Sequence, residues 1–392
     1  MRVLIASYNL ISEKSHLMPW RYVCEAAEFF NSNGHHAIVV SIENSLGDFT
    51  LEKENLLVKK IRKNKAFLYD DINALIKEHA IDVIFWPVSW REASYRLQAL
   101  KNTNKPLIGY FPGGMYSVKD VIYAVKSIGL KASLPYVIEA LSPKKRQLSR
   151  FRHCGFKELI TLTDWTAQCV KLYGWSEEKI TVALPGKENV IHNDEYHIPD
   201  EFKQWLGDLE YLIFMGPPTP IRGGFELLEA FDRVADISTS IRLVCLFRSD
   251  VGVDQSSMKA FISGLKNKDR IYVVWQSLER PLLEAFIANA YAIALPFVVV
   301  PSEIPLALID AASYGKPVIT TNCGGSGKYV EQYGVTVNLS KIAEFSDKLL
   351  KLIEDESFYL QKCSNARSTY DKHPTWNEMS KKWFDVAGRT VS

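Results

Sequence analysis

The chain alternates short apolar runs with longer segments in which apolar residues recur every three or four positions. This alternation predicts parallel βα units, whose strands are apolar on both faces because helices cover both sides of the sheet. Arg21–Asn33 is expected to be a helix that ends before Gly34. In the first half of the chain the predicted strands are Arg2–Ala6, Ala37–Ser41, Asp82–Trp86, Pro106–Tyr110, Leu159–Leu162 and Ile180–Ala183.

A second series of the same kind begins after residue 205, and the polar segment Asn193–Trp205 between the two is the predicted linker. The sequence thus predicts an α/β protein with two Rossmann-like, doubly wound parallel-sheet domains facing each other across a cleft. Ligands are expected beyond the carboxyl ends of the strands. The predicted strands of the second series are Tyr211–Met215, Arg242–Phe247, Ile271–Val274, Tyr291–Leu295, Val318–Thr321 and Val335–Val337. Its predicted helices lie near Phe225–Ala235, Met258–Leu265, Arg280–Ala288, Leu306–Ser313 and Phe345–Ile353.

Composition narrows the class of protein. The length of 392 residues suits two domains, and 47% hydrophobic residues exclude a disordered or fibrous chain. Lys and Arg number 47 against 45 Asp and Glu, which argues against a nucleic-acid partner. The six cysteines contain no Cys-x-x-Cys pair and lie in apolar runs, as in a cytoplasmic protein. We see no signal peptide and no stretch of about 18 uncharged apolar residues, so no transmembrane helix is expected.

Charge is unevenly distributed along the first half of the chain. Residues 101–157 contain eleven Lys and Arg but only Asp120 and Glu139 as acids, and a smaller basic cluster spans residues 59–65. Basic residues interleaved with Leu, Phe and Tyr suit peripheral contact with an anionic membrane through residues 119–157, at the inner face of the membrane, or a lipid-diphosphate acceptor. The solvated basic face of an ordinary helix would have the same composition, and both interpretations stay open.

Two loops of the second half have the residue types that bind phosphate groups. Gly216 ends a predicted strand, and Arg222 and Gly223 close a Pro/Gly loop that opens a helix. Backbone N–H groups and a guanidinium placed in this way suit a diphosphate, although a rigid connector with a surface arginine is the alternative. Gly324 and Gly325 follow another predicted strand and allow a ligand to approach the backbone, or simply form a tight turn.

Two carboxylates lie between these loops. Glu303 immediately precedes a predicted helix and Asp310 lies within it. Carboxylates that face a cleft suit sugar hydroxyls, because each oxygen accepts directional hydrogen bonds. The alternative is that Glu303 caps the helix and Asp310 is solvated.

Together these segments resemble the nucleotide-sugar-binding half of family-4-type retaining glycosyltransferases of the GT-B fold. Gly216 and Arg222-Gly223 match the family's glycine-led basic loop, and residues 310–319 match the second acid of its acidic pair and the sequence that follows. The resemblance implies domains at 1–198 and 206–375, with a helix at about 376–392 that crosses back to the first domain. Pro217 departs from the pattern, since a second basic residue is usual there.

The resemblance also implies roles for the site residues. Arg222 would contact the donor diphosphate, Asp310 the ribose hydroxyls, and the two glycines at 324 and 325 the sugar phosphate. Strict spacing places Ser302 where the family has its first acid, which touches the transferred sugar. We assign that role to the adjacent Glu303, because a carboxylate suits it. The expected catalytic residues are therefore Glu303 and Arg222.

The implied activity is transfer of a sugar from a UDP- or GDP-linked donor to a lipid- or glycan-linked acceptor, with retention. No cofactor is expected, and the absence of an Asp-x-Asp motif agrees with a site without metal. Two alternatives are a nucleotide-sugar epimerase on the same scaffold and a catalytically silent homologue that binds a nucleotide sugar or a membrane. The departures from the family pattern, including a first-domain loop after Pro106–Tyr110 that lacks the usual histidine, keep the silent homologue open.

Overall fold

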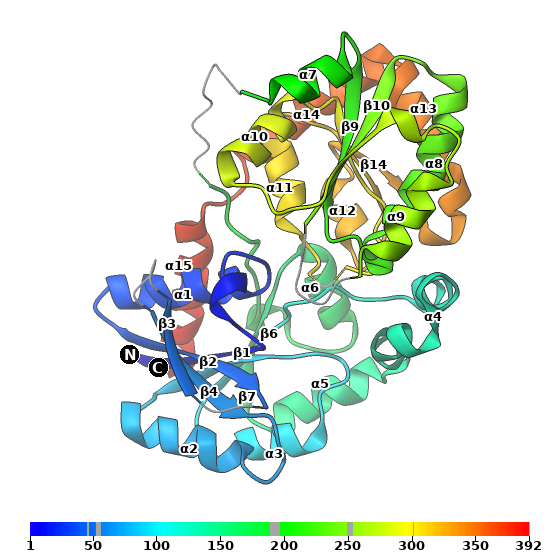
Figure 1. Ribbon diagram of the computed structural model, residues 1–392. Coiled ribbons are helices and arrows are strands. Elements are labelled where there is room, and N and C mark those ends of the chain that lie inside the picture. Colours follow the sequence, from blue (N-terminus) through cyan, green and yellow to red (C-terminus); the bar gives the residue numbers. More distant parts are fainter. Residues whose placement is uncertain (45–46, 52–55, 189–196, 249–253, 301, 392) are drawn as a thin grey trace.

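The chain folds into two α/β domains, each built on its own sheet (Figure 1). The computed structural model describes residues 1–44, 47–51, 56–188, 197–248, 254–300 and 302–391. The predicted fold class of two parallel-sheet domains is confirmed.

The first domain has an eight-stranded sheet in the order β3-β4-β2-β1-β5-β6-β7-β8. All neighbours pair in parallel except β3, which runs antiparallel to β4 at the edge. The strands are β1 (Arg2–Tyr8), β2 (His36–Glu43), β3 (Gly47–Leu51), β4 (Leu56–Arg62), β5 (Val83–Pro87), β6 (Leu107–Tyr110), β7 (Phe156–Thr161) and β8 (Ile180–Val182). The helices are α1 (Trp20–Ser32), α2 (Leu68–His79), α3 (Ser94–Lys101), α4 (Val118–Leu141), α5 (Lys144–His153) and α6 (Asp164–Leu172).

The second domain has a six-stranded parallel sheet in the order β11-β10-β9-β12-β13-β14. Its strands are β9 (Glu210–Gly216), β10 (Ile241–Phe247), β11 (Ile271–Val274), β12 (Ala292–Leu295), β13 (Val318–Thr321) and β14 (Gly334–Val337). Its helices are α7 (Asp200–Leu206), α8 (Gly224–Ile237), α9 (Ser256–Ser263), α10 (Arg280–Asn289), α11 (Leu306–Ser313), α12 (Ser326–Val330), α13 (Phe345–Glu354) and α14 (Glu356–Asp371).

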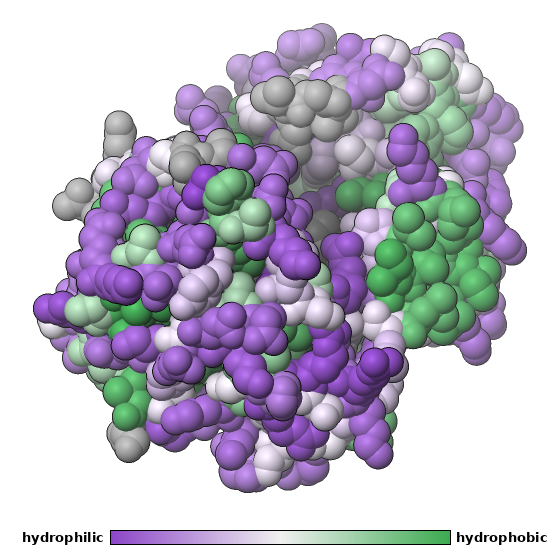
Figure 2. Space-filling model, turned by 90° about the horizontal axis from the view of Figure 1, so that it is seen from below, coloured by the Kyte–Doolittle hydropathy of each residue, from purple (hydrophilic) through white to green (hydrophobic). Residues whose placement is uncertain are grey.

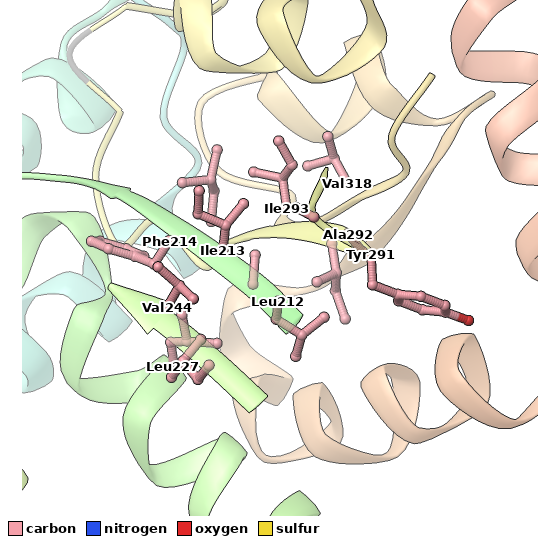
Figure 3. Close-up of a cluster of buried hydrophobic side chains, with 14 of the residues drawn as sticks. Leu212, Ile213, Phe214, Leu227, Val244, Tyr291, Ala292, Ile293 and Val318 are labelled. Carbon is pink, nitrogen blue, oxygen red and sulfur yellow. The ribbon is translucent and has the colours of Figure 1, made fainter. Parts of the chain in front are cut away.

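The inner strands of both sheets, such as β5, β6, β12 and β13, are buried on their two faces, which explains why their sequences are apolar without alternation. In the second domain, Leu212 and Ile213 of β9 lie beside Val244 of β10 and Ile293 of β12, and Leu227 of α8 covers them (Figure 3). All five of these side chains are fully buried. This continuous core fixes the carboxyl ends of β9 and β12, from which the loops of the candidate site emerge.

Two segments differ from the expectation. The first four residues of the basic cluster at 59–65 belong to strand β4 (Leu56–Arg62), in which Val58 and Ile61 are buried. The predicted linker is helical from Asp200, and Phe202 of α7 lies in the core of the second domain. Residues 193–196 of that linker lie outside the described residues. Polarity predicted a linker at 193–205 and gave no strand at 56–62, but burial of a few apolar residues was sufficient to form regular structure in both segments.

No transmembrane helix was expected because the sequence contains no run of about 18 uncharged apolar residues, but one helix that contains a few charges is long and apolar enough to be a candidate. Among the described residues, α4 contains an 18-residue window with a mean hydropathy of 1.3 and at most two charges. The helix is interrupted at Gly129, whose φ of 79° and ψ of 160° are not helical. By length and composition alone α4 is a candidate span.

The last helix, α15 (Trp376–Val391), packs on the first domain, beside α1 (Figure 1). Trp383 is fully buried there, with its ring 5.2 Å from that of Tyr22 and 4.9 Å from that of Phe85. To reach this position the chain crosses between the domains beside its first crossing, where the Lys187 amide donates to the Pro374 carbonyl over 2.8 Å. Two adjacent crossings therefore join the domains.

Candidate active site

The loop after β9 is shaped by glycines. Gly216 has a φ of 146°, and Gly223 has a φ of 77° after the single turn η3 (Pro220–Arg222). A Cβ on Gly223 would lie 1.8 Å from the carbonyl oxygen of Pro296, so no other residue fits against the end of β12. The glycine therefore fixes the loop, and with it the residue before it, close to the neighbouring strand.

That preceding residue, Arg222, lies beside the first domain. Its guanidinium carbon is 5.7 Å from the centroid of the Phe297 ring. Burial raises the pKa of Tyr136 of α4, and the positive charge of Arg222 is among the charges that oppose this rise. The predicted diphosphate-binding cation is thus within electrostatic range of the opposite domain.

Glu303 is fully buried between the domains. Its Oε1 accepts a hydrogen bond from the hydroxyl of Thr163, and its Oε2 accepts one from the hydroxyl of Thr166 over 2.8 Å. Thr163 is also the N-cap of α6, where its Oγ1 accepts from the Thr166 amide over 3.2 Å. Burial raises the pKa of Glu303 to about 7, although the two threonine hydroxyls oppose the rise. Both carboxylate oxygens are therefore held by the first domain in this arrangement.

The Gly324-Gly325 pair touches this contact. A Cβ on Gly325 would lie 2.6 Å from Oε1 of Glu303 and 2.9 Å from the Trp165 ring. A Cβ on Gly114, in the loop after β6, would lie 2.0 Å from the Gly324 carbonyl oxygen. The glycines are required because the loops of the two domains approach each other closely at this point.

Asp310 lies on α11 and contacts a different neighbour. Its Oδ1 accepts from Nη2 of Arg280, at the start of α10, over 3.0 Å. Burial raises the pKa of Asp310, and Arg280 followed by Arg21 of the first domain opposes the rise. Asp310 thus also faces the first domain, near α1, whereas Glu303 faces α6.

The structure brings the predicted residues to one edge of the second sheet. Arg222 follows β9, Glu303 follows β12 and Gly324 and Gly325 follow β13, and these three strands are adjacent. Asp310, in contrast, pairs with Arg280 of α10. Ser302, which occupies the strictly spaced position, is 4% exposed, and its Oγ has no hydrogen-bond partner within the described part of the chain.

The residues that the first domain contributes to the site were not predicted, because the sequence was interpreted one segment at a time. Thr163 and Thr166 hold Glu303, and the hydroxyl of Tyr116 donates to the Val300 carbonyl of the opposite domain. The capping threonine before a helix and the glycine pair at 113–114 after a strand were the available signals. In the ranges that the structure describes, no group of three His, Cys, Asp or Glu side chains is arranged to hold a metal ion.

Comparison with known proteins agrees with this geometry. Residues 210–355 match the family described as glycosyl transferases group 1. No curated protein matches the chain in sequence.

Solved structures match the whole chain at low identity. A glycosyltransferase from Rickettsia africae is 17% identical, with a TM-score of 0.68 over 100% of this chain and 98% of that one. HepE from Anabaena, solved with UDP-glucose, is 14% identical, with a TM-score of 0.66 over 99% and 100%. A sucrose-phosphate synthase from Thermosynechococcus elongatus is 14% identical, with a TM-score of 0.68 over 99% of both chains.

The fold and the matched segment define the class of the protein. Its two domains have the GT-B architecture, and the second contains a group 1 glycosyltransferase domain. The protein is a glycosyltransferase.

Proposed function

We propose that the protein transfers a sugar from a UDP- or GDP-linked donor to a lipid- or glycan-linked acceptor, with retention and without a resident metal. The observation that carries the proposal is the convergence of the Arg222 loop, the Glu303 loop and the Gly324-Gly325 loop at the carboxyl ends of adjacent strands, opposite the first domain. Doubly wound sheets bind nucleotides at this edge. HepE, which shares the fold, was solved with UDP-glucose, and this supports a UDP-sugar.

Arg222 is the residue proposed to stabilise the departing diphosphate. Negative charge develops on that group as the glycosidic bond breaks, and a guanidinium with backbone N–H groups in a closing cleft provides the compensating positive potential. The glycines at 216, 223, 324 and 325 allow the donor to approach the backbone. Asp310 is proposed to accept hydrogen bonds from the ribose hydroxyls.

The residue that faces the transferred sugar is either Glu303 or Ser302. Glu303 would need to exchange the hydroxyls of Thr163 and Thr166 for those of the sugar, whereas the Ser302 Oγ is buried with no hydrogen-bond partner in the described ranges. Donor hydrolysis by Glu303→Gln and by Ser302→Ala separates them. Loss of hydrolysis in the serine variant alone assigns the role to Ser302.

The match to the group 1 family favours transfer over the epimerase. Donor binding is tested by the shift in melting temperature that UDP or GDP produces. Arg222→Ala should weaken binding roughly 10- to 100-fold, as expected for loss of a charge-assisted contact. Arg233→Ala, an exposed arginine on α8, is the matched control and should bind like the parent. Absence of a shift with any nucleoside diphosphate would overturn the proposal, and binding without hydrolysis of any nucleotide sugar would identify a silent homologue.

Three further parts of the proposal have their own tests. The configuration of the glycoside product, followed by proton magnetic resonance, tests retention. Activity after exhaustive chelation, compared with activity after added Mg²⁺, tests whether metal is needed. A cytoplasmic location at the inner face of the membrane is proposed because Cys245 and Cys323 lie buried among apolar neighbours, and cell fractionation tests it.

A further inference from the structure

The α4 helix exposes an apolar face to solvent. Six large apolar side chains on it are 47% to 66% exposed. They represent nearly half of the 13 large apolar side chains that are exposed in the described ranges, although α4 is only 24 residues long. Figure 2 shows a continuous hydrophobic area of this kind on one face of the molecule. The six residues are Val118, Ile122, Leu130, Leu134, Ile138 and Leu141.

The break at Gly129 turns α4 into a helical hairpin. Its first half, including Val118, Ile122 and Val125, and its second half, including Val137 and Leu141, line one groove of about 340 Å³. Since residues from both halves line the same groove, the apolar side chains form one surface rather than a stripe along a straight rod. An exposed apolar surface of this extent on a soluble domain marks an interaction site.

The charges on the hairpin indicate what covers this surface. Lys119, Lys126 and Lys131 are exposed on α4, and Lys145 and Arg146 are exposed at the start of α5. The acids of the hairpin are engaged elsewhere. The carboxylate of Asp120 accepts from the Ser117 amide in the capping box at the start of α4. That of Glu139 is largely buried and lies 3.3 Å from Arg91. An apolar centre accompanied by unopposed lysines is complementary to acyl chains beneath anionic head groups.

The rest of the basic stretch does not contribute apolar contacts. Leu148 and Phe151 of α5, which alternate with basic residues in the sequence, are fully buried in the core of the first domain. The apolar surface is therefore restricted to α4, and α5 can add only charge.

We propose that the α4 hairpin docks the protein on an anionic phospholipid bilayer, with its apolar side chains immersed at the level of the head groups. The hairpin lies on the surface rather than spanning it, because both halves are anchored to the rest of the protein. Ser127 donates to Glu226 of the second domain over 2.5 Å, and Glu139 accepts from the Trp90 amide over 3.3 Å. A span would break these contacts.

This inference rests on the proposed function and refines its acceptor. The loop that leads into α4 contains Gly114 and Tyr116, which contact Gly324 and Val300 of the donor-side domain. The docked hairpin would therefore hold the mouth of the cleft at the membrane surface. An acceptor carried on a membrane lipid, rather than a free glycan, fits this placement.

Sedimentation with vesicles tests the docking. The parent should partition onto phosphatidylcholine vesicles that contain phosphatidylglycerol, and much less onto phosphatidylcholine alone. The triple variant Ile122→Ser/Leu130→Ser/Leu134→Ser should lower the partition coefficient on the order of 100-fold, since each substitution removes an exposed apolar side chain that would enter the bilayer. The matched control Leu172→Ser/Ile237→Ser/Leu360→Ser changes three apolar residues elsewhere that are, as a set, more exposed than those on α4, and it should partition like the parent.

Three outcomes would overturn the docking. Failure of the parent to sediment with anionic vesicles does so, as does an equal loss in the control. Sedimentation equilibrium that shows a dimer which the α4 variant abolishes would assign the surface to a second copy of the chain. Donor hydrolysis measured without vesicles separates the two proposals. A parent that hydrolyses the donor but does not sediment with vesicles refutes only the docking. A parent that sediments with vesicles but does not hydrolyse the donor refutes only the proposed function.

Discussion

Glu303 joins the two domains through a contact whose strength we expect to depend on pH. In this arrangement its carboxyl group is fully buried, and the hydroxyls of Thr163 and Thr166 are its hydrogen-bond partners. Burial raises its pKa from 4.5 to about 7. The arrangement in which Glu303 contacts the two threonines, called closed below, therefore favours the protonated form of Glu303. Ionisation of Glu303 above pH 7 should promote separation of the domains.

The size and sign of the effect follow from the pKa. A shift of about 2.5 pH units corresponds to about 3 kcal/mol, or to a factor of roughly 300 in the equilibrium between closed and open arrangements. Because the pKa is raised in the closed form, this contribution is fully present below pH 4.5 and is lost as the pH rises through 7. Burial, and then the Glu303 charge, raise the pKa of the neighbouring Cys169 thiol, so that the thiol stays neutral in this range.

Small-angle scattering between pH 5 and pH 8.5 measures the effect. The parent should show a larger radius of gyration at high pH. Glu303→Gln should keep the small radius throughout, because the amide cannot ionise and still pairs with the two hydroxyls. Glu354→Gln, an exposed glutamate at the end of α13, is the control and should respond like the parent. The reasoning would be refuted by a parent whose radius of gyration does not change with pH, or by a Glu303→Gln variant whose radius increases with pH as that of the parent does.

Three further substitutions test the site and the fold. Gly325→Ala should destabilise closure by about 1–3 kcal/mol, because residue 325 has a φ of 94° and the new Cβ would lie 2.6 Å from Oε1 of Glu303. An unchanged radius of gyration at pH 5 would contradict this. Asp310→Asn should weaken UDP binding roughly 10-fold by calorimetry if Asp310 binds the ribose, and should change stability by less than about 1 kcal/mol, because its partner Arg280 is 44% exposed. Equal affinity would remove Asp310 from the site. Trp383→Ala should lower the free energy of unfolding by about 3–5 kcal/mol in denaturant titration, and a loss below about 1 kcal/mol would show that α15 is not an essential part of the core.

The sequence predicted the elements that are set by local burial. Strands such as β9 and β12 are apolar on both faces because helices cover both, and this pattern is visible in the sequence without knowledge of the partners. Strand β4 was missed because it lies near the sheet edge, where Lys59 pairs with Asp48 of β3 over 3.0 Å and basic residues interrupt the apolar pattern. Edge positions of this kind conceal a strand within a polar composition.

The position of the Glu303 carboxylate could not be predicted in the same way. Spacing along the chain placed it one residue beyond the expected acid, but its partners Thr163 and Thr166 lie 140 and 137 residues earlier in the sequence. Their contact depends on how the two domains meet, which no local pattern encodes. For the same reason the sequence showed apolar residues interleaved with the basic ones in 119–157 but not which of them are exposed. Leu148 and Phe151 of α5 are buried, whereas the exposed apolar side chains lie on α4.

Closure and docking act on the same short loop of the second domain. Tyr116, two residues before α4, donates to the Val300 carbonyl, and three residues further on Glu303 accepts from Thr163 at the start of α6. A displacement of the α4 hairpin would therefore be transmitted, through the Tyr116–Val300 hydrogen bond, to the segment that contains Ser302 and Glu303. If the hairpin is held at a bilayer, separation of the domains must move this loop away from the surface or break the Tyr116 contact. Vesicles should consequently shift the pH at which the parent opens upward, while the α4 triple serine variant should keep the pH midpoint that it shows in free solution.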